Sequence, residues 1–307
     1  MKKRLLVILL PLMLHTFLMA QTDTLFWFAV PYSTMLHDSP LNADLTLTAT
    51  DVNKKTTVTI SQPYNPQITP ITVIIDPAVS LTKNVHFNQA TLLKFSNNQW
   101  NTKTNSALLI RADHEITAYY ETSRSQNNPA MFNLKGKNAI GYDFWTPFEN
   151  QWPNHVFAST DPAFSQIIVV ATEDNTVVTF NLLKDAFGHV AGTPFTVTLN
   201  KGQTYMLVPK ASGAVPSVLA ADKLVGTHIT SNKPIAVTLG DDSVQKSGAY
   251  DFLGDQNIPV KNAQNKSVIG NEYIVMKGKI GDLGAGNNEK AYVLVTQNNT
   301  FIKADIN

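Results

Sequence analysis

The chain has 307 residues, a formal net charge of +1 and only 15% charged residues. Electrostatics therefore give no case for nucleic acid or an anionic membrane surface as its partner. The sequence contains no cysteine, which excludes disulfide bonds and zinc sites built on cysteine. Its length is sufficient for two or three domains with substantial cores.

The sequence opens with a basic and then an apolar stretch. Lys2, Lys3 and Arg4 precede an apolar run from residue 5 to residue 19, and Ala20 supplies a small residue before Gln21. A run this short is typical of a cleaved secretory signal rather than of a membrane-spanning helix. We therefore predict that residues 1–20 are a signal peptide and that the mature chain is exported, with no transmembrane span.

Strand patterns dominate the rest of the chain. Residues alternate between apolar and polar in several runs, as expected for strands with one face on a core: 45–49, 57–60, 196–199 and 205–208. Three more uniformly apolar runs predict strands that are buried on both faces: 72–75, 107–110 and 167–171. No fifteen-residue window of the mature chain shows a convincing helical period. We predict an all-β fold.

Turn residues separate these runs. Asp, Asn and Gly tolerate left-handed backbone, and such residues occur at 173–175, 200–203 and 230–234. The sequence thus predicts three successive hairpins, with Pro234 opening the strand that follows the last turn. Antiparallel sheets follow, because no crossover helices exist to connect parallel strands.

One segment of the sequence occurs more than once. The stretch that begins at Ala171 returns in altered form at Val295, and a looser version begins at Ala49, which gives spacings of 122 and 124 residues. Such spacings have the size of a small β domain. We predict a first β module over 24–138 and a second over 139–267. Residues 268–307 would start a third, incomplete module or supply closing strands. The predicted architecture is tandem antiparallel β-sandwich-like modules, with a β-propeller as the alternative.

The second of these modules resembles a known family. The segments 169–176, 192–205 and 224–237 are similar to the N-terminal domain of IgGFc-binding proteins. The resemblance covers residues 24–307 and is strongest in the middle copy. It implies an exported surface protein of a Gram-negative bacterium, in which further modules of the same longer chain follow. It names no active site.

Motifs of known chemistry are absent from the sequence. There is no Gly-x-Ser-x-Gly elbow and no phosphate-binding glycine loop, so no catalytic or cofactor-binding residues are predicted. Acidic residues gather once, and as loop carboxylates they are candidate ligands for Ca²⁺: Asp241, Asp242, Asp251 and Asp255. They lack the spacing of a dedicated calcium loop, so solvated carboxylates are the competing interpretation.

Aromatic residues crowd into the segment 144–152. Trp145, Phe148 and Trp152 are the candidate binding residues, because exposed aromatic rings stack on sugars or anchor protein interfaces. The competing interpretation is that Phe144 and Trp145 fill a core where two modules meet.

These features favour an exported, non-enzymatic binding or adhesion module of a cell-surface, outer-membrane or secreted bacterial protein. Its expected partner is an extracellular protein or glycan, such as a glycoprotein or matrix ligand, and tandem copies would add multivalency. Two alternatives remain: a carbohydrate-active accessory domain or hydrolase on a β scaffold, and a structural spacer.

Overall fold

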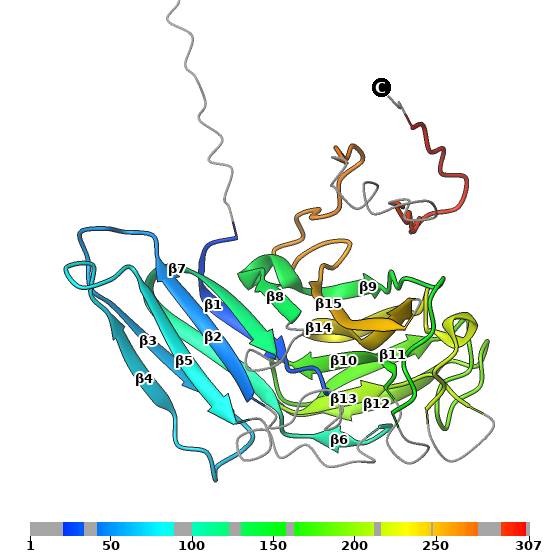
Figure 1. Ribbon diagram of the computed structural model, residues 1–307, viewed down its shortest axis with the longest axis horizontal. Helices are drawn as coiled ribbons and strands as arrows, with labels where there is room; N and C mark the ends of the chain where they lie inside the picture. Colours follow the sequence, from blue (N-terminus) through cyan, green and yellow to red (C-terminus); the bar gives the residue numbers. More distant parts are fainter. Residues whose placement is uncertain are drawn as a thin grey trace, which may run out of the picture.

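The computed structural model describes residues 21–33, 42–88, 100–122, 130–157, 163–211, 216–246, 248–275 and 290–304. The predicted signal peptide, residues 1–20, lies outside the described residues. The described chain folds into two antiparallel sheets that lie side by side, as Figure 1 shows. It is all-β, as predicted, with only two short 3-10 turns, η1 (Gly136–Ala139) and η2 (Ala220–Asp222), and no α-helix among the described residues.

The first sheet has seven strands. They are β1 (Asp23–Ala29), β2 (Asn42–Ala49), β3 (Thr56–Ser61), β4 (Ile71–Ile75), β5 (Thr82–Asn88), β7 (Ala107–Thr122) and β8 (Ala130–Leu134). The order is β4-β3-β7-β2-β5, and β1 and β8 also pair with β7.

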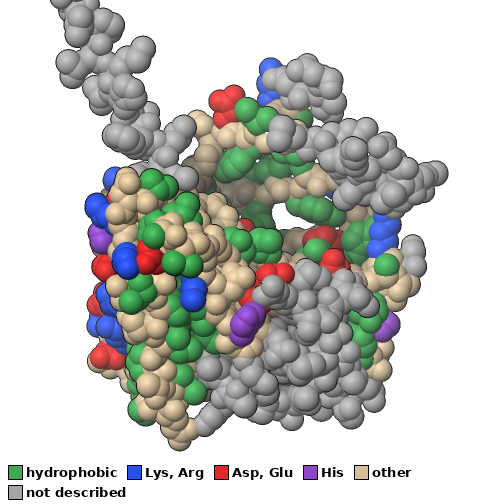
Figure 2. Space-filling view, turned by 60° about the vertical axis from the view of Figure 1, so that its left-hand side comes forward, with side chains coloured by type: hydrophobic (Ala, Val, Ile, Leu, Met, Phe, Trp, Pro, Cys, Tyr) green, Lys and Arg blue, Asp and Glu red, His purple; other side chains and the backbone are tan. Residues whose placement is uncertain are grey.

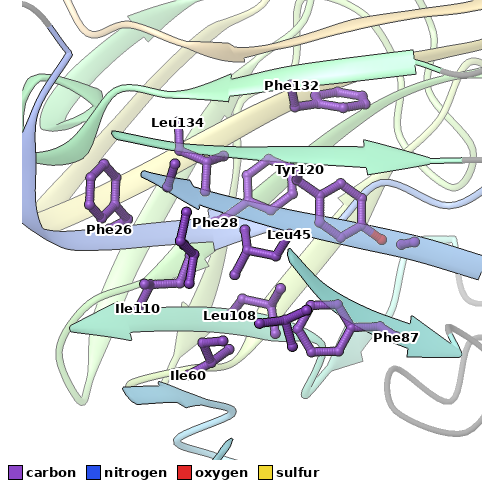
Figure 3. Packing of buried hydrophobic residues seen from close by; sticks show 14 of the residues in the cluster. Phe26, Phe28, Leu45, Ile60, Phe87, Leu108, Ile110, Tyr120, Phe132 and Leu134 are labelled. Atoms are coloured by element: carbon purple, nitrogen blue, oxygen red, sulfur yellow. The ribbon is translucent and has the colours of Figure 1, made fainter. Parts of the chain in front are cut away.

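The long strand β7 organises this sheet. Its residues 107–112 lie between β1 and β3, whereas its residues 116–122 lie between β2 and β8. The sheet therefore divides near Asp113 into two halves, β4-β3-β7-β1 and β5-β2-β7-β8. Alternate residues of every strand in both halves point into one apolar cluster, so the halves form a sandwich. Figure 3 shows side chains of β1, β2, β3, β5, β7 and β8 meeting in that core.

Eight strands make up the second sheet. They are β6 (Lys103–Thr104), β9 (Ile140–Trp145), β10 (Ser165–Ala171), β11 (Thr176–Asn181), β12 (Phe195–Leu199), β13 (Thr204–Leu207), β14 (His228–Lys246) and β15 (Ala249–Asn257). Their order is β12-β11-β14-β10-β13-β6, and β9 and β15 pair with β14. If β6 is set aside, the strands follow the order of the first sheet, with β14 in the place of β7.

The bends of the two central strands carry the same hydrogen bonds. Asp113 Oδ1 accepts from the Thr57 N–H at 2.8 Å, and Asn232 Oδ1 accepts from the Val177 N–H at 2.7 Å. Thr50 donates its N–H and its hydroxyl to the Glu115 carbonyl, and Thr172 donates the same two groups to the carbonyl of Pro234. The likeness between the two segments thus extends from sequence to individual bonds.

The three predicted hairpins are wrong, although the turns lie where they were expected. Residues 173–175 connect β10 to β11, and residues 200–203 connect β12 to β13, but the strands that each turn joins do not pair with each other. Residues 230–234 lie inside β14 and form its bend. The turn backbone is as predicted, with φ of 55° at Asn175 and 83° at Gly202. A short turn can cross between two layers as well as reverse within one, and the alternation of residues is the same in both cases.

Apolar side chains of the second sheet, among them Phe144, Val169 and Ile235, form a second core, so this sheet also makes a sandwich. A third apolar cluster joins the two sandwiches. Trp27 and Ala29 of β1 point away from the first core and pack with Ile168 and Val170 of β10. The strand 167–171 is buried on both faces for this reason, as its uniformly apolar sequence predicts, and the same holds for 107–110. The prediction fails for 72–75, because β4 is an edge strand whose outer face is in water and Ile74 is 58% exposed.

Two buried glutamines of the second sheet reinforce this junction. Gln166 accepts from the Tyr32 N–H at 2.8 Å and donates to the Tyr32 carbonyl at 2.5 Å. Gln256 donates to the Trp27 carbonyl at 2.6 Å and accepts from the Lys135 N–H at 2.7 Å. The two amides thus supply hydrogen-bond partners to backbone groups of Trp27, Tyr32 and Lys135, which would otherwise lack these partners.

The described residues after β15 form no strand. Ser267 makes an isolated bridge with Lys261, and Lys290 and Tyr292 contact Gln151. A familiar turn nevertheless recurs here. Asn299 has φ of 60°, and Thr300 donates its hydroxyl to the Gln297 carbonyl at 2.8 Å, as Thr176 does to the Glu173 carbonyl at 2.7 Å.

Candidate functional site

A buried lysine marks the most unusual polar cluster of the described chain. Lys223 follows the 3-10 turn η2 and is only 1% exposed. Its Nζ donates to Asp241 Oδ2 at 2.7 Å and to Glu149 Oε2 at 3.0 Å. Asp241 lies on β14, and Glu149 lies in the loop that follows β9. Three segments far apart in sequence thus meet at one ammonium group. We call Lys223, Glu149 and Asp241 the lysine cluster.

The carboxylates of the lysine cluster are held from all sides. Burial raises the pKa of Asp241 to about 6, although the charge of Lys223 and the hydrogen bonds from Lys223 and Asn154 act against this. Asn154 Nδ2 donates to Asp241 Oδ1 at 2.7 Å. The second oxygen of Glu149 accepts from the Trp152 N–H at 2.9 Å and from the Gln151 N–H. Every carboxylate oxygen of the cluster therefore has a protein partner.

A cleft of about 340 Å³ lies beside the lysine cluster. Glu149 and Asp241 belong to its wall together with Lys135 and Asp255, and most of the remaining lining is apolar, including Phe148 and Leu253. The space-filling view in Figure 2 shows a hollow on one face of the molecule, with hydrophobic and acidic side chains at its edge. Charges of both signs are interspersed on the described part of that face, in keeping with the net charge of +1.

Aromatic rings gather near the end of β14 and the start of β15. The His155 ring stacks on Tyr250 at 4.6 Å, and Phe157 meets Tyr250 edge-on at 5.2 Å. Lys246 Nζ lies over the Trp152 ring, 5.0 Å from its centroid. These side chains are half-buried, so each ring keeps part of its surface in water. We call Trp152, His155, Phe157 and Tyr250 the aromatic edge.

The three predicted aromatic candidates have different environments. Trp145 stacks on His228 with 4.3 Å between the ring centroids, and Phe148 is buried in the second core and lines the cleft. Trp152 belongs to the aromatic edge. Phe144, for which core packing was the competing interpretation, is fully buried, in the core of the second sandwich rather than where the two sandwiches meet.

The four predicted calcium ligands are in separate environments. Asp241 is held by Lys223, and Asp242 accepts from the Ser243 hydroxyl at 2.8 Å. Asp251 accepts from the Phe252 N–H at 2.8 Å, and Asp255 pairs with Lys135 at 2.5 Å. Among the described residues, no three His, Cys, Asp or Glu side chains come together in a way that could hold a metal ion.

Sequence reasoning missed Lys223, Glu149 and Asn154. Lys223 is 74 residues from Glu149 and 18 from Asp241, and Asn154 is 87 residues from Asp241. No spacing rule brings a lone lysine before a strand to a carboxylate within it. Tyr250 and His155 were missed for the same reason. Only the crowding of aromatic residues before 152 was visible in the sequence.

Comparison with known proteins identifies the family. The sequence model of the IgGFc binding protein family matches residues 130–307, which is more than half of the chain. The chain therefore belongs to this family. Among solved structures, a chain titled "Crystal Structure of Thermotoga maritima 1070" matches at 14% identity over 40% of this chain and 95% of its own, with a TM-score of 0.27. Comparison with curated proteins gave no match.

No helix within the described ranges is long and apolar enough to cross a membrane.

Proposed function

We propose that the chain is an exported, non-enzymatic binding module of a bacterial surface protein, which contacts an extracellular protein or glycan through the aromatic edge. The observation that carries the proposal is membership of a family of binding proteins, together with half-exposed aromatic rings at one end of the second sandwich. Rigid aromatic side chains bind with little loss of conformational entropy, and Trp and Tyr dominate binding energies at interfaces.

We extend this proposal to the segment after β15. We take residues 268–307 as the start of a third copy, because the turn at 297–300 repeats the geometry of the turn at 173–176. Several apolar side chains of this segment are exposed, including Phe301 at 98% and Ile274 at 90%. In the second copy the corresponding strands β9, β10 and β11 pair with β14, so a further β segment is the partner that suits this segment best.

One observation favours a hydrolase instead. Two carboxylates, Glu149 and Asp241, belong to the wall of one cleft, and one of them has a raised pKa. The oxygens of both carboxylates, however, accept hydrogen bonds from Lys223, Asn154 and backbone N–H groups, so each oxygen is already bound within the protein. We therefore assign these groups to the interior of the protein rather than to a reaction with a bound substrate.

Binding measurements on variants test the proposal. The purified chain is probed against IgG Fc, mucins, matrix glycoproteins and a glycan array. A variant that combines Trp152→Ala with Tyr250→Ala should reduce the affinity for whichever ligand binds by about tenfold or more, because truncating such anchors commonly costs over 1 kcal/mol each. Tyr142→Ala is the matched control, since Tyr142 is exposed on β9 and lies outside the aromatic edge.

The outcomes separate the three functions. Loss of binding in the double variant, with Tyr142→Ala unchanged, supports the proposal. If the wild-type chain binds none of the probes, the structural spacer is the function supported. Hydrolysis of any glycan probe, abolished by Asp241→Asn, would establish the enzyme instead.

A further inference from the structure

We propose that Lys223 and Asp241 become joined by an intramolecular amide bond between Nζ and Cγ, and that Glu149 is the group that moves the protons. The product is a covalent cross-link between the loop before β14 and β14 itself. The proposal concerns the lysine cluster alone and does not depend on which ligand the module binds.

The geometry places the reacting groups together. Lys223 Nζ is 2.7 Å from Asp241 Oδ2, which puts the amine next to the carboxyl carbon. Glu149 Oε2 is 3.0 Å from the same Nζ, within reach of the proton that the amine must lose. Lys223 and Asp241 are only 1% and 4% exposed, so the pair is held in one arrangement away from bulk water.

Burial favours the neutral reactants. Separate charges are expensive in a water-poor interior, and one proton passed from Nζ to Oδ2 along their hydrogen bond turns the ion pair into a neutral amine and a neutral acid. Burial also raises the pKa of the Asp241 carboxyl to about 6, which is the direction that protonates it. The neutral amine is the nucleophile, and the neutral acid is the better electrophile.

The reaction is a condensation that balances without another reagent. The nitrogen lone pair of Lys223 attacks Asp241 Cγ, and the C–N bond forms as the carbonyl pair moves to oxygen. Glu149 accepts a proton from the nitrogen and passes it to Oδ2, so that the C–Oδ2 bond breaks and one water leaves. Nothing is oxidised or reduced. Glu149 ends in its starting state.

The surroundings suit the product. The retained oxygen, Oδ1, keeps the hydrogen bond that Asn154 Nδ2 donates at 2.7 Å, and the new amide N–H keeps Glu149 as its acceptor. Water can leave through the adjacent cleft, since Glu149 and Asp241 belong to its wall. Release of water from a site that excludes it favours the amide over the separate groups.

The fold itself does not require the lysine cluster. By strand register, the position of Asp241 opposite Ser165 corresponds in the first sheet to Thr122 opposite Ala43. The first sandwich thus has the same strand order without a lysine–aspartate pair at this place. A chain without cysteine has no disulfide to close it, and the amide would give the second sandwich a covalent bond of comparable effect.

Peptide mass spectrometry of the purified wild-type chain tests the proposal. Digestion should yield one cross-linked species, made of the peptide with Lys223 and the peptide with Asp241, whose mass is their sum less one water. Fragmentation must place the bond between these two side chains, which distinguishes it from an aspartate that has cyclised alone. Trypsin should also fail to cleave after Lys223.

Three variants sharpen the result. Lys223→Arg should abolish the cross-link, and Glu149→Gln should reduce its yield at least tenfold while circular dichroism shows the sheets intact. Lys135→Arg is the matched control, because Lys135 also lines the cleft and pairs with an aspartate but is not part of the lysine cluster. Wild-type protein in which Lys223 and Asp241 are recovered only in separate, unmodified peptides would overturn the proposal, whatever the variants do.

Discussion

Replacing Gln166 with methionine tests how the two sandwiches are held together. Gln166 is fully buried, and its amide binds both the N–H and the carbonyl of Tyr32, which is itself only 4% exposed. Methionine has nearly the same shape but no amide, so both backbone groups lose this partner without a large cavity. Each lost partner costs about 1–3 kcal/mol, and we expect Gln166→Met to lower the free energy of unfolding by about 3 kcal/mol in total.

Urea unfolding followed by tryptophan fluorescence measures this change. Trp27 lies in the same apolar junction, so its emission reports on the region that Gln166 supports. Gln297→Met is the control, because the side chain of Gln297 is exposed, and it should change stability by no more than about 0.5 kcal/mol. A loss below about 1 kcal/mol for Gln166→Met would refute the reasoning, since it would mean that Tyr32 finds other partners at no cost.

Four further results are expected. Burial lowers the pKa of His189, so as the pH falls the unfolded chain binds a proton before the folded chain does. The stability that His189 contributes is therefore present above about pH 6.5 and is lost as the pH falls below it. Replacing His189 with Gln should weaken the pH dependence of the melting temperature in this range. Burial raises the pKa of Tyr205 to about 12, so absorbance titration should show one tyrosine ionising late, and stability should fall above about pH 10 because the unfolded chain ionises first. Gly254→Ala should destabilise by about 1–3 kcal/mol in urea, because the new methyl group would meet the Phe132 ring and lie 2.8 Å from the Leu239 carbonyl oxygen. Asp113→Ala and Asn232→Ala should each cost about 1 kcal/mol and add in the double variant, because they remove equivalent bonds in different sheets.

Each of these has an outcome that contradicts it. If the melting temperature of His189→Gln follows the wild-type pH profile, His189 is not the source of the pH dependence. If the late tyrosine titration is unchanged in Tyr205→Phe, Tyr205 is not the residue that ionises late. Wild-type stability of Gly254→Ala would mean that Phe132 moves aside freely. Strong non-additivity of the Asp113 and Asn232 substitutions would show that the two bends are coupled.

The extent to which the fold follows from the sequence can be seen in β10. The run 167–171 is uniformly apolar, and the structure buries both of its faces, one in the second core and one in the junction with the first sandwich. The sequence could not reveal which strands pair across the turns at 173–175 and 200–203. Turn residues determine local backbone, whereas pairing depends on long-range packing that a short segment does not encode.

For the candidate site, the sequence revealed less. The crowding of aromatic residues around Trp152 was visible, but Tyr250 joins that surface only because the chain returns along β15. Asp241 was one of four carboxylates considered either as candidate calcium ligands or as solvated loop residues, whereas its actual neighbour is an ammonium group. Nothing local distinguishes a lysine that will be buried from one that will be solvated, since the difference arises when three distant segments meet.

The junction between the sandwiches has a mechanical consequence. The two-residue strand β6 comes from the segment that precedes β7, yet it pairs with β13 of the second sheet. The two buried glutamines of the second sheet bind the backbone of Trp27 in β1 and of Tyr32 just after it. The two sandwiches are thus joined by a fixed interface rather than by a flexible linker. If further copies dock in the same way, the polypeptide grows as a stiff rod, and its reach from an anchoring surface increases in proportion to the number of copies rather than to its square root.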